Sequence, residues 1–205
     1  MTKAIIIRKY GGPEVLQWED VNVGDPGDEE VRIRHEAIGL NFRDIYHRSG
    51  SYGVPDDQFP AILGSDGAGT IEAIGNGVND LTIGQRVAYG NGPMGSYSQS
   101  RIMPAKFIIP LPDEIEFHTA AAMMVKGMTA RYLIRSCFNV VPGDTILIQA
   151  VAGGVGLILC QWAKHLGASV IGTVSTEEKA NLAKHYGCDY TINYTTENFS
   201  KRVRE

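Results

Sequence analysis

The first half of the chain alternates short apolar runs with turn residues, a pattern typical of β-strands. Strands are expected over residues 4–7, 31–37, 70–74 and 101–109. Turns rich in glycine, proline, asparagine and aspartate are expected at 11–13, 25–28, 75–77 and 90–93. One helix is expected over 41–48. The pattern predicts a β-rich N-terminal domain.

Beyond Pro112 the apolar positions change period, and strands alternate with helices. Helices are expected over 118–135, 156–165 and 177–186, and strands over 145–150, 169–174 and 190–193. The run 145–150 suits a strand that is buried on both faces. The alternation predicts an α/β fold in which residues 1–115 form the β-rich domain and 116–205 form a Rossmann-type, doubly wound parallel sheet.

The end of the chain suggests an incomplete sheet. Residues 196–198 are expected to begin another helix, and the chain stops inside it at Glu205. A doubly wound sheet normally has two βαβαβ halves, and this chain supplies only the first. We therefore expect a truncated chain, which by itself binds its cofactor weakly and turns over poorly.

Composition narrows the class of ligand. The 24 glycines among 205 residues cluster at turns, which indicates positions where bare backbone is needed. A net charge of −4 without runs of like charge argues against nucleic acid and against a membrane surface, and favours a small molecule. Three cysteines without a CxxC pair indicate a reducing compartment. With no signal peptide or long apolar segment, we expect a cytoplasmic protein.

The segment from Ala150 to Gly156 has the context of a dinucleotide-binding loop, because it joins a predicted strand to a predicted helix. Its glycines permit a tight turn and a close approach of the backbone to a pyrophosphate. The start of the helix adds unpaired N–H groups and a partial positive charge. Predicted binding residues here are Ala152, Gly153, Gly154, Val155 and Gly156. The alternative is a glycine-rich turn without a ligand.

The next strand ends at 173–176, where NAD-specific proteins place an acid on the ribose 2′-OH. No acid stands in the strand end itself. Ser175, Thr176 and Lys179 offer two hydroxyl groups and an ammonium group for a 2′-phosphate, which favours NADPH over NADH. Glu177 and Glu178 follow closely, and we interpret them as acids of the first helical turn.

Several motifs, in order along the whole chain, resemble those of the medium-chain dehydrogenase/reductase superfamily. Within it, the chain is most similar to the zinc-free quinone oxidoreductases related to zeta-crystallin. The motifs are Tyr10-Gly11-Gly12-Pro13-Glu14-Val15-Leu16, Gly39-Leu40-Asn41-Phe42-Arg43-Asp44-Ile45-Tyr46, Arg48-Ser49-Gly50 with Tyr52, Lys126-Gly127-Met128-Thr129-Ala130, and Gly153-Gly154-Val155-Gly156 leading to Cys160-Gln161-Trp162-Ala163-Lys164.

The resemblance implies a GroES-like barrel as the catalytic domain, with NADPH in a cleft between it and the Rossmann domain. Zinc-dependent relatives carry an early cysteine and a Gly-His-Glu motif. The matching stretches here are 41–44 and 64–67, which lack cysteine and histidine. We therefore expect no catalytic zinc.

The resemblance also assigns roles to single residues. Near the nicotinamide and the substrate it places Asn41, Asp44, Tyr46 and Tyr52, with Asn41 also touching the cofactor. Further cofactor contacts are Lys126, Thr129, Gly172, Thr173, Ser175, Lys179 and Tyr194. Plainer readings remain open: a helix N-cap for Asn41, a first-turn acid for Asp44, ordinary cleft aromatics for the tyrosines, and a solvent-directed side chain for Lys126.

The expected activity is hydride transfer from NADPH to a quinone without zinc or flavin. One alternative is reduction of α,β-unsaturated carbonyl compounds. A second is a non-catalytic protein that binds NADPH or RNA. The net charge of −4 argues against RNA. As partners we expect a small quinone or enone and, for a full-length protein, a second copy of the chain in a homodimer.

Overall fold

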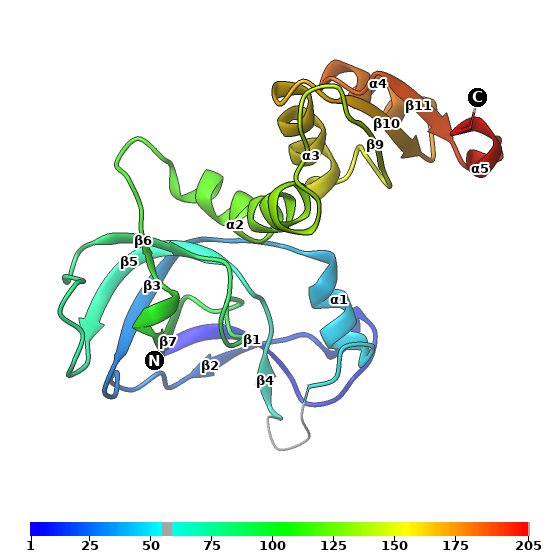
Figure 1. Ribbon diagram of the computed structural model, residues 1–205. Helices are drawn as coiled ribbons and strands as arrows, with labels where there is room; N and C mark the ends of the chain where they lie inside the picture. Colours follow the sequence, from blue (N-terminus) through cyan, green and yellow to red (C-terminus); the bar gives the residue numbers. More distant parts are fainter. Residues whose placement is uncertain (55–58, 205) are drawn as a thin grey trace. The chain divides into compact units, whose positions relative to one another are not determined.

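The structure, a computed structural model, describes residues 1–54 and 59–204 (Figure 1). It divides into two compact units, Met1–Val125 and Lys126–Glu205. The division falls within helix α2 (Phe117–Tyr132), whereas the predicted boundary lies just before this helix. Each unit is described by itself.

The first unit is built on two antiparallel sheets among its described residues. The larger has the order β7-β3-β5-β6-β8, and the smaller has the order β2-β1-β4 (Figure 1). Their strands are β1 (Thr2–Ile7), β2 (Gln17–Val21), β3 (Glu30–Ile38), β4 (Ala61–Ile62), β5 (Gly67–Ile74), β6 (Arg86–Tyr89), β7 (Ser100–Pro104) and β8 (Ile109–Pro110). Helix α1 (Phe42–Ser49) follows β3. The β-rich fold predicted for this half is confirmed.

The pairing of β3 with β5 forms the centre of the larger sheet. Val31, Ile33 and Ile71 project from these strands into one buried apolar cluster. The register shifts twice along this pair, and Gly69 lies beside the second shift. A Cβ atom at Gly69 would stand 2.0 Å from the carbonyl oxygen of Arg34. The two backbones approach this closely only because residue 69 has no side chain.

Some predicted strand bounds in this unit are wrong. The run 101–109 is not one strand, because a 3-10 turn (Ala105–Phe107) separates β7 from β8. Strands β2, β4 and β6 were not predicted. The β2 sequence, Gln17 to Val21, has no fully buried position, so it carries no clear alternation. The four residues of β6 give too short a pattern to read.

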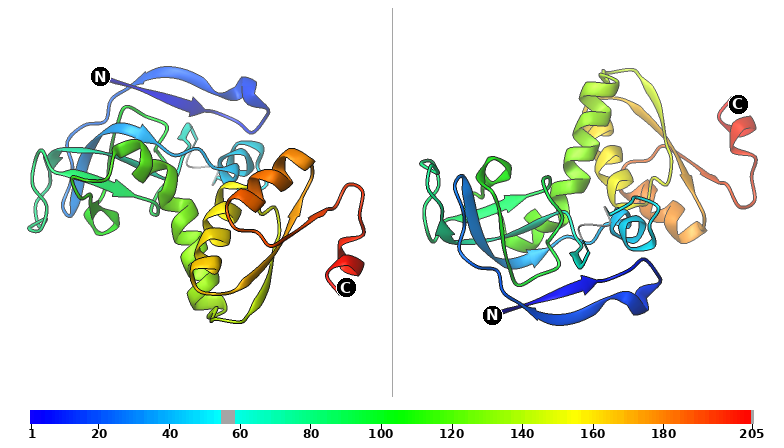
Figure 2. Two further views of the ribbon diagram at one scale, coloured as in Figure 1. Left: turned by 90° about the horizontal axis from the view of Figure 1, so that it is seen from above. Right: turned by 90° about the horizontal axis from the view of Figure 1, so that it is seen from below.

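The second unit is a parallel sheet of order β11-β10-β9 with connecting helices. Its strands are β9 (Thr145–Ile148), β10 (Ser169–Val174) and β11 (Tyr190–Asn193), and its helices are α3 (Gly154–His165), α4 (Glu177–His185) and α5 (Phe199–Arg202). Both crossovers run in the same direction, which places α3 and α4 on the same face of the sheet (Figure 2). The predicted α/β class and the incomplete Rossmann-type sheet are confirmed.

Two of the predicted helices in this unit end at a glycine, as expected. Gly167 and Gly187 follow α3 and α4 with φ of +84° and +99°, the left-handed conformation that closes a helix. Helix α2, predicted to run to residue 135, instead passes into a π-helical turn at Leu133–Cys137. Among the described residues, no helix has both the length and the apolar character needed to cross a bilayer.

Two expectations about this unit are wrong. Strand β9 ends at Ile148, and its Thr145 and Leu147 are exposed, because they point to the face of the sheet opposite the apolar core that Ile146 and Ile148 join. The chain also does not stop within a helix. Helix α5 ends at Arg202, and Glu205 lies outside the described residues.

A partly buried histidine in the first unit joins two strands of the larger sheet. The Nδ1 atom of His35 lies 2.6 Å from the carbonyl oxygen of Ser98, and its Nε2 lies 2.6 Å from the hydroxyl of Tyr89. A carbonyl only accepts, so Nδ1 carries the proton. Burial lowers the pKa of His35 to about 4, and the nearby positive charge of Arg101 acts in the same direction. The ring is therefore neutral near pH 7.

This shift predicts a loss of stability in mild acid. A folded-state pKa of about 4, below the unfolded value of 6.5, means that the unfolded chain binds the proton first as the pH falls. The His35 contribution is fully present above pH 6.5 and is lost between pH 6.5 and 4, by up to roughly 3 kcal/mol. Urea unfolding of wild type and His35→Gln from pH 7.5 to 4.5 should show the smaller pH dependence in the variant. If the free energy of unfolding depends on pH equally in the two proteins, the prediction is wrong.

Candidate functional site

The first part of the site is the start of helix α1, which two buried carboxylates hold. Asn41 precedes the helix, and its backbone N–H donates to Oδ2 of Asp44 over 2.9 Å. The Asn41 side-chain Nδ2 donates to Oδ1 of Asp66 over 2.7 Å. Oδ2 of Asp66 accepts from the backbone N–H of Val125 over 3.2 Å. Asn41 is thus the N-cap of α1 and Asp44 lies in its first turn, while Asp66 contacts the Asn41 side chain from outside the helix.

The Asp66 carboxylate can pack against residue 39 only because that residue is a glycine. A Cβ atom at Gly39 would lie 2.2 Å from Oδ1 of Asp66, so residue 39 must leave that space open. Asp66 itself has no exposed surface. Sequence reasoning noted the 64–67 stretch only for its missing zinc ligands and missed Asp66 as a partner of Asn41. The acidic residue within the 64–67 stretch was the signal that could have indicated this partner of Asn41.

Asp44 is also buried, and a tyrosine contacts it. The hydroxyl of Tyr97 donates to Oδ2 of Asp44 over 2.9 Å. Burial raises the pKa of Tyr97, as does the negative charge of Asp44, so the phenol keeps its proton. Within the described chain, Oδ1 of Asp44 is buried without a hydrogen-bond partner. A buried acceptor of this kind needs a donor, and a bound ligand is one source. No sequence signal pointed to Tyr97.

Tyr46 and Tyr52 lie together at the far end of α1. Their ring centroids are 4.9 Å apart, and the ring of Phe42 meets Tyr46 edge-on at 5.3 Å. All three side chains are exposed. The backbone N–H of Tyr52 donates to the carbonyl of Tyr46, and the Nδ1 of His47 lies 3.0 Å from the carbonyl of Tyr52. The first unit thus presents an aromatic surface on the helix that Asn41 precedes and that carries the buried Asp44, and the substrate role of these residues stays a prediction.

The second unit has a candidate site of its own, the loop between β9 and α3. Gly153 precedes α3 without any side-chain cap, and the first N–H groups of the helix have no intrahelical acceptor. A Cβ atom at Gly154 would lie 2.9 Å from Cδ and Cε of Lys126. A Cβ atom at Gly156 would lie 2.5 Å from the carbonyl oxygen of Ala150. Bare backbone at both positions makes a cradle of the size and polarity that an anion needs.

Lys126 therefore lies on the glycine loop, although the two are nearly thirty residues apart in sequence. Its aliphatic stem covers Gly154, which places the ammonium group in the same region of the second unit. Thr129 lies one turn later on α2 and is partly buried. Val155 is partly buried in the first turn of α3 and packs against the apolar core of this unit.

The entry to the glycine loop is fixed by the hydroxyl of Thr173. It accepts from the backbone N–H of Ala150 over 3.0 Å and donates to Oε1 of Gln149 over 2.7 Å. Ala150 has a φ of +50°, a left-handed conformation that costs a non-glycine residue about 1–2 kcal/mol. Thr173 is buried, and its two hydrogen bonds hold the residue that turns the chain into the loop.

A small cavity of about 100 Å³ lies at the carboxyl end of β10, where doubly wound sheets bind their ligands. It is lined by Ala150, Ala152, Gly153, Thr173, Val174, Ser175, Lys179 and Tyr194. The Nζ atom of Lys179 lies 3.2 Å from the Ser175 hydroxyl. Six of the predicted cofactor residues are thus gathered around one cavity.

The neighbouring polar residues have helix-capping roles. Thr176 caps α4, since its hydroxyl accepts from the N–H of Lys179, and Glu177 and Glu178 lie in the first turn. Gly172 does not line the cavity. A Cβ atom there would lie 2.3 Å from Cγ1 of Val151, so the glycine serves the packing of the sheet.

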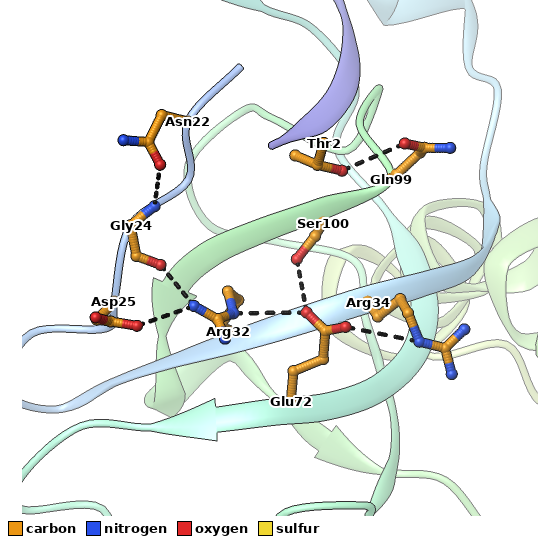
Figure 3. Close-up of polar contacts among 9 residues, drawn as sticks. All are labelled: Thr2, Asn22, Gly24, Asp25, Arg32, Arg34, Glu72, Gln99 and Ser100. Atoms are coloured by element: carbon orange, nitrogen blue, oxygen red, sulfur yellow. Dashed lines mark hydrogen bonds and ion pairs between the residues drawn. The ribbon is translucent and has the colours of Figure 1, made fainter. Parts of the chain in front are cut away.

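A larger polar cavity of about 730 Å³ lies on the first unit, and sequence reasoning did not predict it. Figure 3 shows its charged side chains, which neutralise one another. Glu72 lies 3.5 Å from Nε of Arg32 and 3.7 Å from Nε of Arg34, and Arg32 also pairs with Asp25. Ser100 donates to the same Glu72. These pairs leave no dominant charge for a ligand, so we interpret them as support for the sheet.

Two family models match the chain. Residues 27–113 match the model described as "Alcohol dehydrogenase GroES-like domain", and residues 154–205 match the model described as "Zinc-binding dehydrogenase". Among the described residues, no three His, Cys, Asp or Glu side chains gather into a metal-binding group. A β-rich GroES-like unit followed by a parallel sheet with a glycine-lined helix start defines the medium-chain dehydrogenase/reductase class.

Individual relatives indicate which group within this class the chain resembles. The chain is 50% identical over 205 residues to a quinone oxidoreductase of Pseudomonas aeruginosa and 48% identical over 208 residues to a 2-haloacrylate reductase of a Burkholderia species. All of this chain is covered, and 62% of each relative. The crystal structure of Escherichia coli quinone oxidoreductase complexed with NADPH superimposes with a TM-score of 0.96 at 42% identity, over 98% of this chain and 61% of that one.

The chain belongs to the quinone oxidoreductase family of medium-chain dehydrogenases/reductases, which confirms the predicted resemblance. It spans about 62% of the length of the curated relatives it matches.

The Thr173 hydroxyl gives a prediction that stability measurements can test. Thr173→Val keeps the shape but removes both hydrogen bonds, leaving the partly buried N–H of Ala150 without its protein acceptor. The free energy of unfolding should fall by about 0.5–1.5 kcal/mol, as measured by urea denaturation. Thr173→Ser retains the hydroxyl and should lose clearly less. Equal losses in the two variants would show that the hydroxyl does not support the loop.

Proposed function

We propose that the protein carrying this chain transfers hydride from NADPH to a quinone, without a metal or a flavin. The observation that carries the proposal is the cavity at the end of β10, where Ser175 and Lys179 stand together and no carboxylate takes part. Relatives named quinone oxidoreductase, at 42–50% identity over the whole chain, support the substrate. We further propose a cytoplasmic enzyme that acts as a homodimer.

The residues of the second unit fit a dinucleotide. The N–H groups at the start of α3 and the bare Gly154 and Gly156 suit the pyrophosphate, with Lys126 adding a positive charge beside them. Ser175 and Lys179 suit a 2′-phosphate through a hydroxyl and an ammonium group. Tyr194 completes the lining of that cavity and is half exposed, so its ring is available to an adenine.

The residues of the first unit suit the reacting end of the substrate. When bound, NADPH supplies a hydride; reducing a quinone to a hydroquinone consumes one hydride and one proton. The phenols of Tyr46 and Tyr52 can donate hydrogen bonds to a quinone oxygen as negative charge develops there, and their rings can stack on the substrate. Asn41 is held in one orientation by Asp66, and Oδ1 of Asp44 offers a buried acceptor.

A second candidate is reduction of an activated carbon–carbon double bond. The observation that favours it is the 48% identity to a 2-haloacrylate reductase, which is nearly as high as the identity to the quinone oxidoreductase of Pseudomonas aeruginosa. Both reactions deliver a hydride to an electron-poor acceptor, so the same cofactor site serves either.

Lys179→Ala tests the proposed preference for NADPH. Loss of the ammonium group should raise the Kd for NADPH about tenfold at low salt and leave the Kd for NADH unchanged, because only NADPH carries the 2′-phosphate. The measurement is titration of nicotinamide fluorescence, using the protein as its gene encodes it. Lys184→Ala on the same helix is the matched control and should bind both nucleotides as wild type does. Equal weakening for both nucleotides would contradict the assignment.

A substrate panel tests the proposed reaction. The purified protein, stripped of flavin and treated with a metal chelator, should oxidise NADPH with 1,4-benzoquinone or a naphthoquinone and form one hydroquinone for each NADPH consumed. The kcat/KM for these quinones should exceed that for 2-chloroacrylate and for simple enones. A higher kcat/KM for the unsaturated carboxylate would select the second candidate, and loss of turnover with chelator would contradict metal-free chemistry.

A further inference from the structure

The motif that begins at Tyr10 takes no part in the proposed chemistry, yet it lies against the segment that does. It follows β1 and runs beside α1 (Figure 1). The N–H of Gly11 donates to the carbonyl of Arg48 over 3.1 Å, and Nε of Arg48 donates to the carbonyl of Gly11 over 3.2 Å. Two reciprocal hydrogen bonds therefore fix residue 11 to the last turn of α1.

The side chain of Tyr10 extends this contact beyond the helix. Its hydroxyl donates to the carbonyl of Val54 over 2.6 Å and accepts from the N–H of the same residue over 2.7 Å. One phenol thus satisfies both backbone groups of Val54, whose side chain is buried. The ring of Phe59 meets Tyr10 edge-on at 5.2 Å.

The ring of Tyr10 also lies on the residue that ends α1. Gly50 has a φ of +86°, and a Cβ atom there would lie 3.1–3.3 Å from ring atoms of Tyr10. Tyr10 therefore contacts the chain at Gly50 and at Val54. Tyr52 lies midway between these two points.

From these contacts we propose that Tyr10 is a positioning residue for substrate binding. It holds the segment from Gly50 to Val54 at both ends and so sets the ring of Tyr52 against Tyr46. Tyr52 itself contacts Tyr46 and His47 of α1. On the C-terminal side of Tyr52, the segment is held by the hydrogen bonds between Tyr10 and Val54. The inference rests on the proposed role of Tyr52 as a substrate contact.

Tyr10→Phe removes only the hydroxyl that binds Val54. We expect amide hydrogen exchange over residues 50–54 to accelerate at least tenfold, which mass spectrometry of the cofactor-free protein can follow. In the protein as its gene encodes it, the KM for a naphthoquinone should rise about five- to tenfold while kcat changes less than twofold. The Kd for NADPH should not change, because no predicted cofactor residue contacts Tyr10. Unchanged exchange and unchanged KM would overturn the proposal.

A control separates positioning from a general loss of stability. Ile71→Val shortens a buried side chain in the same unit and is expected to cost about 0.5–1.5 kcal/mol of stability. It should leave both the exchange of residues 50–54 and the KM at wild-type values. If Ile71→Val raises the KM as much as Tyr10→Phe does, Tyr10 acts through stability alone and the proposal fails.

A double-mutant cycle with Tyr52→Ala separates this inference from the proposed function. If Tyr10 acts through Tyr52, adding Tyr10→Phe to Tyr52→Ala should not raise the KM further. Additive effects would overturn the inference and leave the substrate role of Tyr52 intact. A wild-type KM in Tyr52→Ala would instead remove Tyr52 from the substrate site, and hydrogen exchange alone would then decide whether Tyr10 holds the segment.

Discussion

The hydrogen bond between the Asn41 side chain and the buried Asp66 is the interaction on which the first half of the site depends. It joins the start of α1 to the turn that enters β5, two segments that are separated along the chain. Removing either partner would leave a buried polar group unsatisfied, which costs more than the hydrogen bond contributes. Gly39 is constrained for the same reason, since a side chain there would occupy the space of the carboxylate.

The same principle organises the second unit, where a hydroxyl replaces the carboxylate. Thr173 lies on β10 and binds Gln149 and Ala150, which follow β9, so the neighbouring strand sets the start of the loop that is proposed to receive an anion. The strain of Ala150 at positive φ persists because this contact fixes it. In both units, residues outside the binding elements hold those elements in a productive conformation. Tyr10 extends that pattern to the segment that carries Tyr52.

The two halves of the proposed chemistry have opposite electrostatic requirements. The cofactor part uses backbone N–H groups and the ammonium groups of Lys126 and Lys179, which suit phosphate. The proposed substrate part has two buried carboxylates, Asp44 and Asp66, and an exposed aromatic surface. A neutral, flat acceptor such as a quinone is compatible with such a surface, because its binding depends on ring contacts and on hydrogen bonds to oxygen.

The sequence by itself determined the strands, the crossover helices and the glycine loop, because apolar periodicity and chain-reversing glycines act locally. Strand β10 and strand β11 have the predicted bounds. Prediction from the sequence failed where local signals are weak, as in β2. It also failed where the packing of neighbouring elements decides which face of a strand is buried, as in β9. Only the tertiary structure brought Asp66 to Asn41, Lys126 to Gly154 and Tyr10 to Val54. These contacts join positions far apart in sequence, and no periodicity records which distant side chain will satisfy a buried polar group.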